Sequence, residues 1–197
     1  MFTTISFAGS RSIHNSYALK EKITEFFTNV ENIIFKQEYK PEYLHINLLN
    51  GLADGADMEC ADAFGDWQPE YQTRKSISGI FPFPKENYLQ TIFDKQRFER
   101  LTSKCDTIII LDGHYILNEG SDVNAEIFAK ECRARAYRQQ SSFLLSSCDF
   151  LFAVVDFSIS GKEGGTLETL ANAKSKGIPA AFINLINMQI DMSGLTF

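Results

Sequence analysis

Three glycine-containing loops in this chain carry polar and charged residues of the kinds that bind phosphate. The residues concerned are Gly9, Ser10 and Arg11 in the first loop, Gly51, Asp54, Gly55 and Asp57 in the second, and Gly164, Gly165 and Thr166 in the third. A serine hydroxyl and an arginine guanidinium can both donate hydrogen bonds to a phosphate oxygen. Glycine lets the backbone approach an anion closely, above all at the start of a helix, where N–H groups point outward. Together the loops predict an anion-binding site.

Carboxylates near these loops are candidates to bind the rest of such a ligand. Asp57, Asp112 and Glu168 can each accept hydrogen bonds from ribose hydroxyls. The structural alternative for Asp57 is the N-cap of the next helix, and for Glu168 a place in a first helical turn, where negative charge is favoured. If the protein is an enzyme that cleaves a glycosidic bond, it needs a carboxylate near the anomeric carbon, and Glu168 is the candidate. Arg138 lies on the helix predicted at 122–145, where its structural role would be in a solvated basic face.

The elements that must position these residues alternate between strands and helices. Short β-rich runs predict six strands, at 3–8, 43–49, 76–81, 107–111, 150–155 and 178–184. Helical patterns lie at 17–30, 58–64, 88–103, 122–145 and 167–176, with Thr166 as the expected N-cap of the last. The run 150–155 is apolar throughout, as is typical of a parallel strand covered on both faces. The tail, 187–197, is either an edge element or a mobile end.

This alternation predicts an α/β fold, a Rossmann-like doubly wound sheet that is mostly parallel and has helices on both faces. The length of 197 residues and the hydrophobic content of 44% suit one core, so we expect a single domain over residues 1–197. In such sheets ligands bind at the carboxyl ends of the strands, where all three loops are expected. Neither GxGxxG nor GxxxxGK[ST] occurs, which disfavours a standard dinucleotide site and a P-loop.

The composition disfavours several classes of partner. The net charge of -6 disfavours duplex nucleic acid, whose binding depends on neutralising phosphates with Lys and Arg. No apolar stretch reaches the roughly 20 residues that span a bilayer, so we expect a cytoplasmic protein with no membrane partner. The four cysteines lack CxxC spacing and neighbouring histidines, which favours reduced structural thiols and predicts no metal site. No cofactor is expected.

The three loops resemble those of the SLOG superfamily, a Rossmann-like group that includes the cytokinin-activating phosphoribohydrolases, also called lysine decarboxylase-like proteins. The resemblance covers about residues 3 to 185 and is most specific at Gly164-Gly165-Thr166-Leu167-Glu168. It implies a nucleotide or nucleotide-sugar ligand at the strand ends, and it implies that Glu168 and Arg138 match the glutamate and arginine that promote cleavage of the N-glycosidic bond. It also implies homo-oligomerisation, with the helix at 122–145 near the interface.

The sequence leaves three functions open. The glycine motif is shorter than in the hydrolases and residues 157–163 form an insertion, which is similar to a second branch that senses nucleotide second messengers in bacterial defence. The first hypothesis is therefore a binder of a cyclic nucleotide, an ADP-ribose derivative or a related ligand. The alternative is a nucleoside monophosphate phosphoribohydrolase, for which the same loops would hold the substrate. The third is a protein-interaction module that has kept the fold without the pocket.

Overall fold

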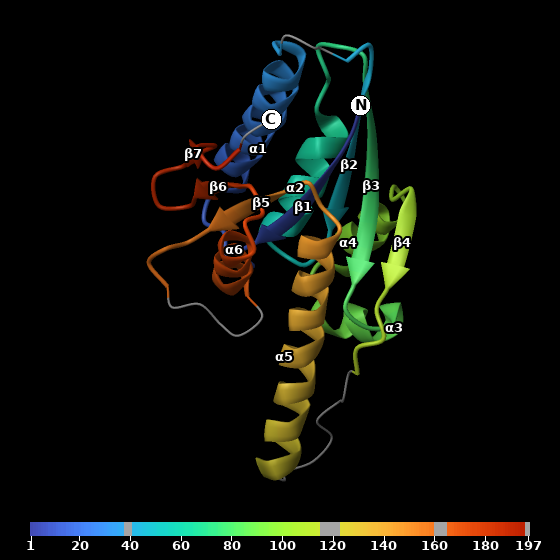
Figure 1. Ribbon diagram of the computed structural model, residues 1–197. Coiled ribbons are helices and arrows are strands. Elements are labelled where there is room, and N and C mark those ends of the chain that lie inside the picture. The colour runs from blue at the N-terminus through green and yellow to red at the C-terminus, as the bar shows by residue number, and fades with distance from the viewer. Residues whose placement is uncertain (38–40, 115–122, 160–164, 196–197) are drawn as a thin grey trace.

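The computed structural model describes residues 1–37, 41–114, 123–159 and 165–195, and it shows a seven-stranded α/β sheet (Figure 1). The strands are β1 (Phe2–Gly9), β2 (Leu44–Asn50), β3 (Thr73–Phe81), β4 (Thr107–Ile110), β5 (Phe150–Val155), β6 (Ala180–Asn184) and β7 (Gln189–Asp191). Their order in the sheet is β4-β3-β2-β1-β5-β6-β7, and every neighbouring pair is parallel except β6 and β7. The predicted fold class is confirmed, and all six predicted strands form.

Helices cover both faces of this sheet. They are α1 (Ser16–Phe35), α2 (Ala56–Asp66), α3 (Lys85–Tyr88), the 3-10 helix η1 (Leu89–Thr91), α4 (Lys95–Thr102), α5 (Val123–Ser146) and α6 (Thr166–Ser175). The alternation of side chains along β1 assigns the faces: Ile5 and Phe7 pack with α1 and α2, whereas Ala8 packs against the cluster that α5 and α6 contribute. Figure 1 shows α5 crossing that second face and projecting well beyond the carboxyl ends of the strands.

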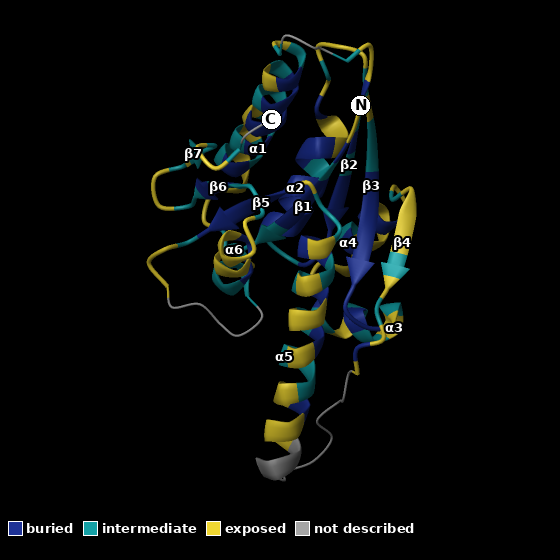
Figure 2. Ribbon diagram, viewed as in Figure 1, coloured by how far each residue is buried: buried dark blue, intermediate teal, exposed yellow. Residues whose placement is uncertain are grey.

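The largest cluster of the core is aromatic and lies between α1, α2 and the central strands. Phe26 of α1 stacks on Phe152 of β5, with ring centroids 3.6 Å apart, and Phe27 packs against Phe64 and Trp67. All six residues of β5 are buried, as the apolar run at 150–155 predicted (Figure 2). This double coverage holds β1 and β5 rigidly, and their carboxyl ends form the floor of the site described below.

The helix predicted at 88–103 is the main error in the predicted elements. The chain turns through α3 and η1, becomes extended at Ile92, and starts again at α4, whose N-cap Asp94 accepts a hydrogen bond from the N–H of Arg97. The carboxylate of Asp54 accepts hydrogen bonds from the N–H groups of Phe93 and Asp94, at 2.9 and 3.1 Å. These contacts stabilise the break, since they satisfy N–H groups that a continuous helix would have paired internally.

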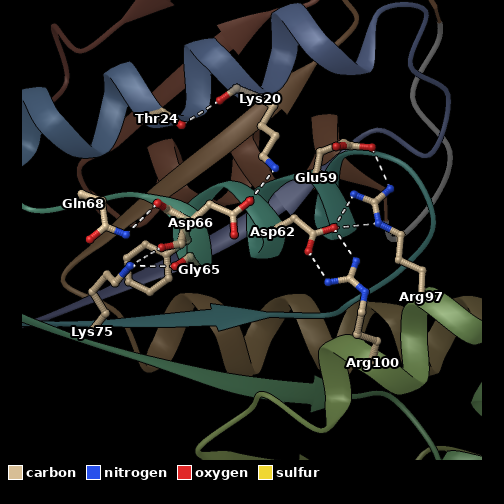
Figure 3. A network of polar contacts seen from close by, with 11 residues as sticks. Lys20, Thr24, Glu59, Asp62, Gly65, Asp66, Gln68, Lys75, Arg97 and Arg100 are labelled. Carbon is tan, nitrogen blue, oxygen red and sulfur yellow. Dashed lines mark hydrogen bonds and ion pairs between the residues drawn. The ribbon is translucent and has the colours of Figure 1, made fainter.

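An ion-pair network ties α4 to α2 behind this break (Figure 3). Asp62 of α2 accepts hydrogen bonds from both nitrogens of the Arg100 fork, and also from Nε of Arg97, while Arg97 pairs with Glu59 at 2.7 Å. Glu59 and Asp62 are largely buried, so this network is screened less than ordinary surface pairs. The tail adds the antiparallel edge strand β7, one of the two outcomes that the sequence left open. Within the described residues, no helix is both long and apolar enough to cross a bilayer.

Candidate ligand-binding site

A cleft of about 490 Å³ lies at the carboxyl ends of β1 and β5. Its walls come from five parts of the chain: the end of β1 with its loop (7–12), the loop after β2, the α3–η1 turn, one face of α5, and the end of β5 with the start of α6. β1 and β5 are neighbours in the sheet, and the connections that follow them lead to opposite sides, to β2 and to β6. Such a switch point is where open α/β sheets bind ligands.

The first two glycine loops are packed against each other and fix the floor of the cleft. A Cβ added to Gly9 would lie 2.6 Å from the Cβ of Ala56, so the strand end can approach α2 only without a side chain. Gly55 has a φ of +88°, and a Cβ there would lie 2.4 Å from the carbonyl oxygen of Arg11. The N–H of Ala56 donates to the carbonyl of Ser10 at 2.9 Å. The two loops therefore form one rigid unit.

Arg11 is the cation of this unit, and its guanidinium crosses the cleft toward α5. It donates to the hydroxyl of Tyr137 at 2.9 Å, lies over the Tyr137 ring, and makes a longer contact of 3.4 Å with the carbonyl of Thr91. Burial lowers the pKa of Arg11, but Tyr137, Tyr88 and, to a smaller extent, Asp57 outweigh burial and hold the pKa above its usual value. The side chain is still exposed to solvent, so a ligand can reach it.

Asp57 is a buried carboxyl group in the floor of the cleft. Its exposed fraction is 9%, and it lies between the backbones of Gly9 and Gly51, where an added Cβ would be 3.1 and 2.9 Å from its two carboxylate oxygens. Burial raises its pKa to about 7, although hydrogen bonds from backbone N–H groups and the charge of Arg11 act in the opposite direction. The N-cap prediction is wrong, because Gly55 occupies that position and Asp57 lies inside the first turn of α2.

Side chains that the sequence did not single out close the cleft around Asp57. Tyr88 donates from its hydroxyl to the carbonyl of Gly51 at 2.9 Å, and Gln140 donates from Nε2 to the carbonyl of Ile80 at 2.6 Å. Tyr137, Gln140 and Ser141 all line the cleft from α5. They stand at positions i, i+3 and i+4 of the helix predicted at 122–145, so a polar stripe along one face of that helix was the signal that the sequence offered.

The third loop is described from Gly165 onward, and Gly164 lies outside the described residues. Gly165 is the N-cap of α6 and Thr166 is its first residue, so the prediction of Thr166 as N-cap is wrong by one position. Gly165 and Thr166 both line the cleft. Deeper in the same helix, Thr169 donates to the hydroxyl oxygen of Ser141 at 2.9 Å and joins α6 to α5. A helix N-terminus therefore faces the loop that carries Arg11.

Four other predicted residues are not part of the cleft lining. Asp112 lines a separate pocket of about 200 Å³, together with His114, Cys132 and Arg135. Asp54 is used in the break before α4, as described above. Arg138 and Glu168 are not among the residues that line the cleft, although their neighbours Tyr137, Leu167 and Thr169 are. The site brings together Gly9, Ser10, Arg11, Gly51, Asp57, Gly165 and Thr166.

No known family model matches this chain, and no curated protein sequence matches it significantly. The resemblance to the SLOG superfamily therefore remains a prediction from the sequence. Within the parts of the chain that the structure describes, no group of three or more His, Cys, Asp or Glu side chains is placed to hold a metal ion.

Proposed function

We propose that the cleft binds a nucleotide or a nucleotide-derived ligand, with the phosphate between Arg11 and the start of α6. The observation that carries this proposal is the position of Arg11 at the β1–β5 switch point, with the N-terminus of α6 also in the wall. A guanidinium and a helix N-terminus are both donors that favour an anion, and they approach the cleft from different elements.

The size and the remaining walls suit the rest of a nucleotide. A volume of about 490 Å³ is within the range of small-molecule sites, roughly 300–1,000 Å³. The aromatic ring of Tyr137 and the apolar side chains of Val155, Ile159 and Leu167 offer surfaces for a base or sugar. By the resemblance to SLOG sensors, the proposal extends to cyclic nucleotides and ADP-ribose derivatives that act as signals in bacterial defence.

Hydrolysis of an N-glycosidic bond is the second candidate function, and one observation favours it. A glycosidic hydrolase needs a carboxyl group beside the anomeric carbon, and a pKa near neutrality suits an acid or base catalyst. Asp57 provides such a group inside the cleft, with a pKa of about 7. The catalytic pair Glu168 and Arg138, in contrast, is absent from the lining.

Binding is tested by a thermal-shift screen of nucleoside monophosphates, cyclic dinucleotides and ADP-ribose, followed by calorimetry on each ligand that raises the melting temperature. We expect Arg11→Ala to weaken binding roughly tenfold to a hundredfold, because a charge-assisted hydrogen bond is removed. Arg74→Ala is the matched control: Arg74 is exposed on β3 and paired in register with His45, at the amino end of the sheet. A screen without any shift, or equal effects of the two variants, contradicts the proposal.

Turnover is tested by incubating each hit with the protein and measuring the released base. If the protein hydrolyses the ligand, comparing Glu168→Gln with Asp57→Asn identifies the carboxylate responsible. We expect binding without release of base from the wild-type protein. Release of base that one of these variants abolishes would establish the hydrolase instead.

A further inference from the structure

The floor of the cleft holds a carboxyl group with very little charge compensation. Asp57 lies against the backbone of Gly9 and Gly51, and its Oδ2 is 3.4 Å from the N–H of Ala53, a long hydrogen bond. A buried carboxylate is stable only when it is paired or well hydrogen-bonded. A backbone hydrogen bond from Gly9 adds to the support for the ionised form, but burial outweighs both bonds and disfavours that form.

The titratable groups around Asp57 come from three helices and the loop after β1, where Arg11 is the cation that acts on Asp57; a second arginine, Arg133 of α5, also lines the cleft. Cys60 lies on the same helix and is fully buried, and Tyr88 approaches from α3; both are influenced by the negative charge of Asp57. From α5 come Tyr137, which holds Arg11, and the neutral amide of Gln140. The backbone N–H groups of Ala53 and Gly9 favour the ionised form of Asp57, and Arg11 adds the attraction of a full positive charge.

A ligand phosphate would compete with Asp57 for that cation. An anion bound by Arg11 withdraws part of the compensating charge and brings a second negative charge into the same cleft. Two anions in a partly desolvated site repel each other, and Asp57 can remove the repulsion by taking up a proton. The neutral carboxylic acid can in addition donate a hydrogen bond, which the carboxylate cannot.

We propose that Asp57 is a specificity-determining residue that is protonated when an anionic ligand fills the cleft, so that ligand and proton bind together. This inference rests on the proposed function. It differs from the expectation that Asp57 accepts hydrogen bonds from ribose, because here the residue selects for negative charge. The near-neutral pKa of Asp57 in the unliganded cleft means that the exchange takes place in the physiological pH range.

The test is calorimetric titration with ADP-ribose and with cyclic di-AMP at pH 8, in HEPES and in Tris, whose ionisation enthalpies differ. Both probes carry phosphates that stay fully ionised around neutral pH, so the protons counted belong to the protein. We expect an uptake of about half a proton or more per ligand bound at pH 8, and a loss of affinity on the order of tenfold between pH 7 and pH 9.

Asp57→Asn should bind with no proton uptake and with an affinity that is flat over this pH range. Asp156→Asn is the matched control, because Asp156 also lines the cleft but is fixed as a carboxylate by hydrogen bonds from Ser158, which lower its pKa. This control should keep the proton uptake of the wild-type protein. If Asp57→Asn does not fold, infrared difference spectra of the wild-type protein replace it, with a new protonated-carboxyl band expected on binding.

The outcomes separate this inference from the proposed function. Binding of either probe without proton uptake, or with the same uptake in Asp57→Asn, overturns the role of Asp57 and leaves nucleotide binding intact. Binding of neither probe also overturns it, whereas the proposed function falls only if the whole nucleotide screen is empty. Uptake that is lost in Asp57→Asn and kept in Asp156→Asn establishes the inference.

Discussion

The carboxyl group of Asp57 should also affect how the stability of the unliganded protein depends on pH. Its pKa is about 7 in the folded protein, because burial disfavours the charged form, and its usual value is near 4. Between about pH 4 and pH 7 the folded state holds a proton that the unfolded state has released. Stability contributed by this group therefore falls as the pH rises through that window and is constant above it.

We expect Asp57→Asn to remove this decline. The variant should lose less stability than the wild-type protein between pH 5 and pH 8, with a difference on the order of 2.5 kcal/mol for a pKa that moves from near 4 to about 7. Urea unfolding of both proteins at the two pH values measures it, and the wild-type pH dependence of all other groups cancels in the comparison. Identical declines in the two proteins would mean that Asp57 titrates normally.

At the scale of elements, the packing of α4 on α2 is stabilised by the carboxylate of Asp62, which accepts hydrogen bonds from two arginines of α4. Hydrogen bonds from Arg100 and Arg97 outweigh burial and lower the pKa of Asp62, so its contribution to stability is present at neutral pH and is lost as the pH falls below about 4. The pH dependence is thus opposite in sign to that of Asp57. Both residues lie on α2, five positions apart, and their different partners account for the difference.

We expect Asp62→Asn to lower the free energy of unfolding by about 2 kcal/mol at pH 7, because charge-assisted hydrogen bonds from two arginines are weakened. Asp66→Asn is the control on the same helix: its ion pair with Lys20 is exposed on both sides and should contribute under about 0.5 kcal/mol (Figure 3). Denaturant unfolding at pH 7 and pH 3 measures both. If the two variants lose the same free energy of unfolding, the network around Asp62 stabilises the protein no more than an ordinary surface ion pair does.

The elements predicted well were those with a strong local pattern. The run 150–155 had to be a covered strand because nothing in it could face water, and β5 has the predicted bounds. The break before α4 was missed because it depends on Asp54, about 40 residues away, whose carboxylate accepts the N–H groups at the break. Local propensity carries no information on such a contact.

The candidate site was predictable to the same extent. The glycine loops predicted the edge of the sheet at which the cleft lies, since the carboxyl ends of parallel strands lie together. The burial of Asp57 was not predictable, because it depends on how closely β1 approaches α2 at Gly9. The hydrogen bond between Arg11 and Tyr137 was not predictable either, because these residues are 126 positions apart in the sequence.

For the whole molecule, stability should be greatest in the centre of the sheet. β1 and β5 are each paired on both sides and β5 is buried throughout, whereas β4 is an edge strand in which Thr107, Ile108 and Ile110 are exposed. Amides in well-covered central strands exchange only through large openings of the structure, while edge strands open locally. The sheet therefore predicts a gradient of protection from centre to edge.

Hydrogen–deuterium exchange followed by mass spectrometry measures this gradient. We expect peptides from β1 and β5 to exchange far more slowly than those from β4 and β7, at a pH and temperature where the protein is stable. Peptides covering α1, which packs on the central strands through Phe26 and Phe27, serve as an internal reference for slow exchange. Exchange of β4 as slow as that of β5 would indicate that the edge is covered in solution.

The helix α5 is bonded both to β1 and to the cation of the cleft. Its carboxyl-terminal end is held by the hydroxyl of Ser6, which donates to the carbonyl of Leu144 at 2.7 Å. Tyr137 stands seven residues away along the helix axis, about 10 Å from that pivot. A tilt of about 10° around Leu144 would displace Tyr137 by roughly 2 Å, enough to separate its hydroxyl from Arg11. The buried bond from Gln140 to the carbonyl of Ile80 and the bond from Thr169 to Ser141 oppose such a tilt, so they keep Tyr137 within reach of the cation in the cleft.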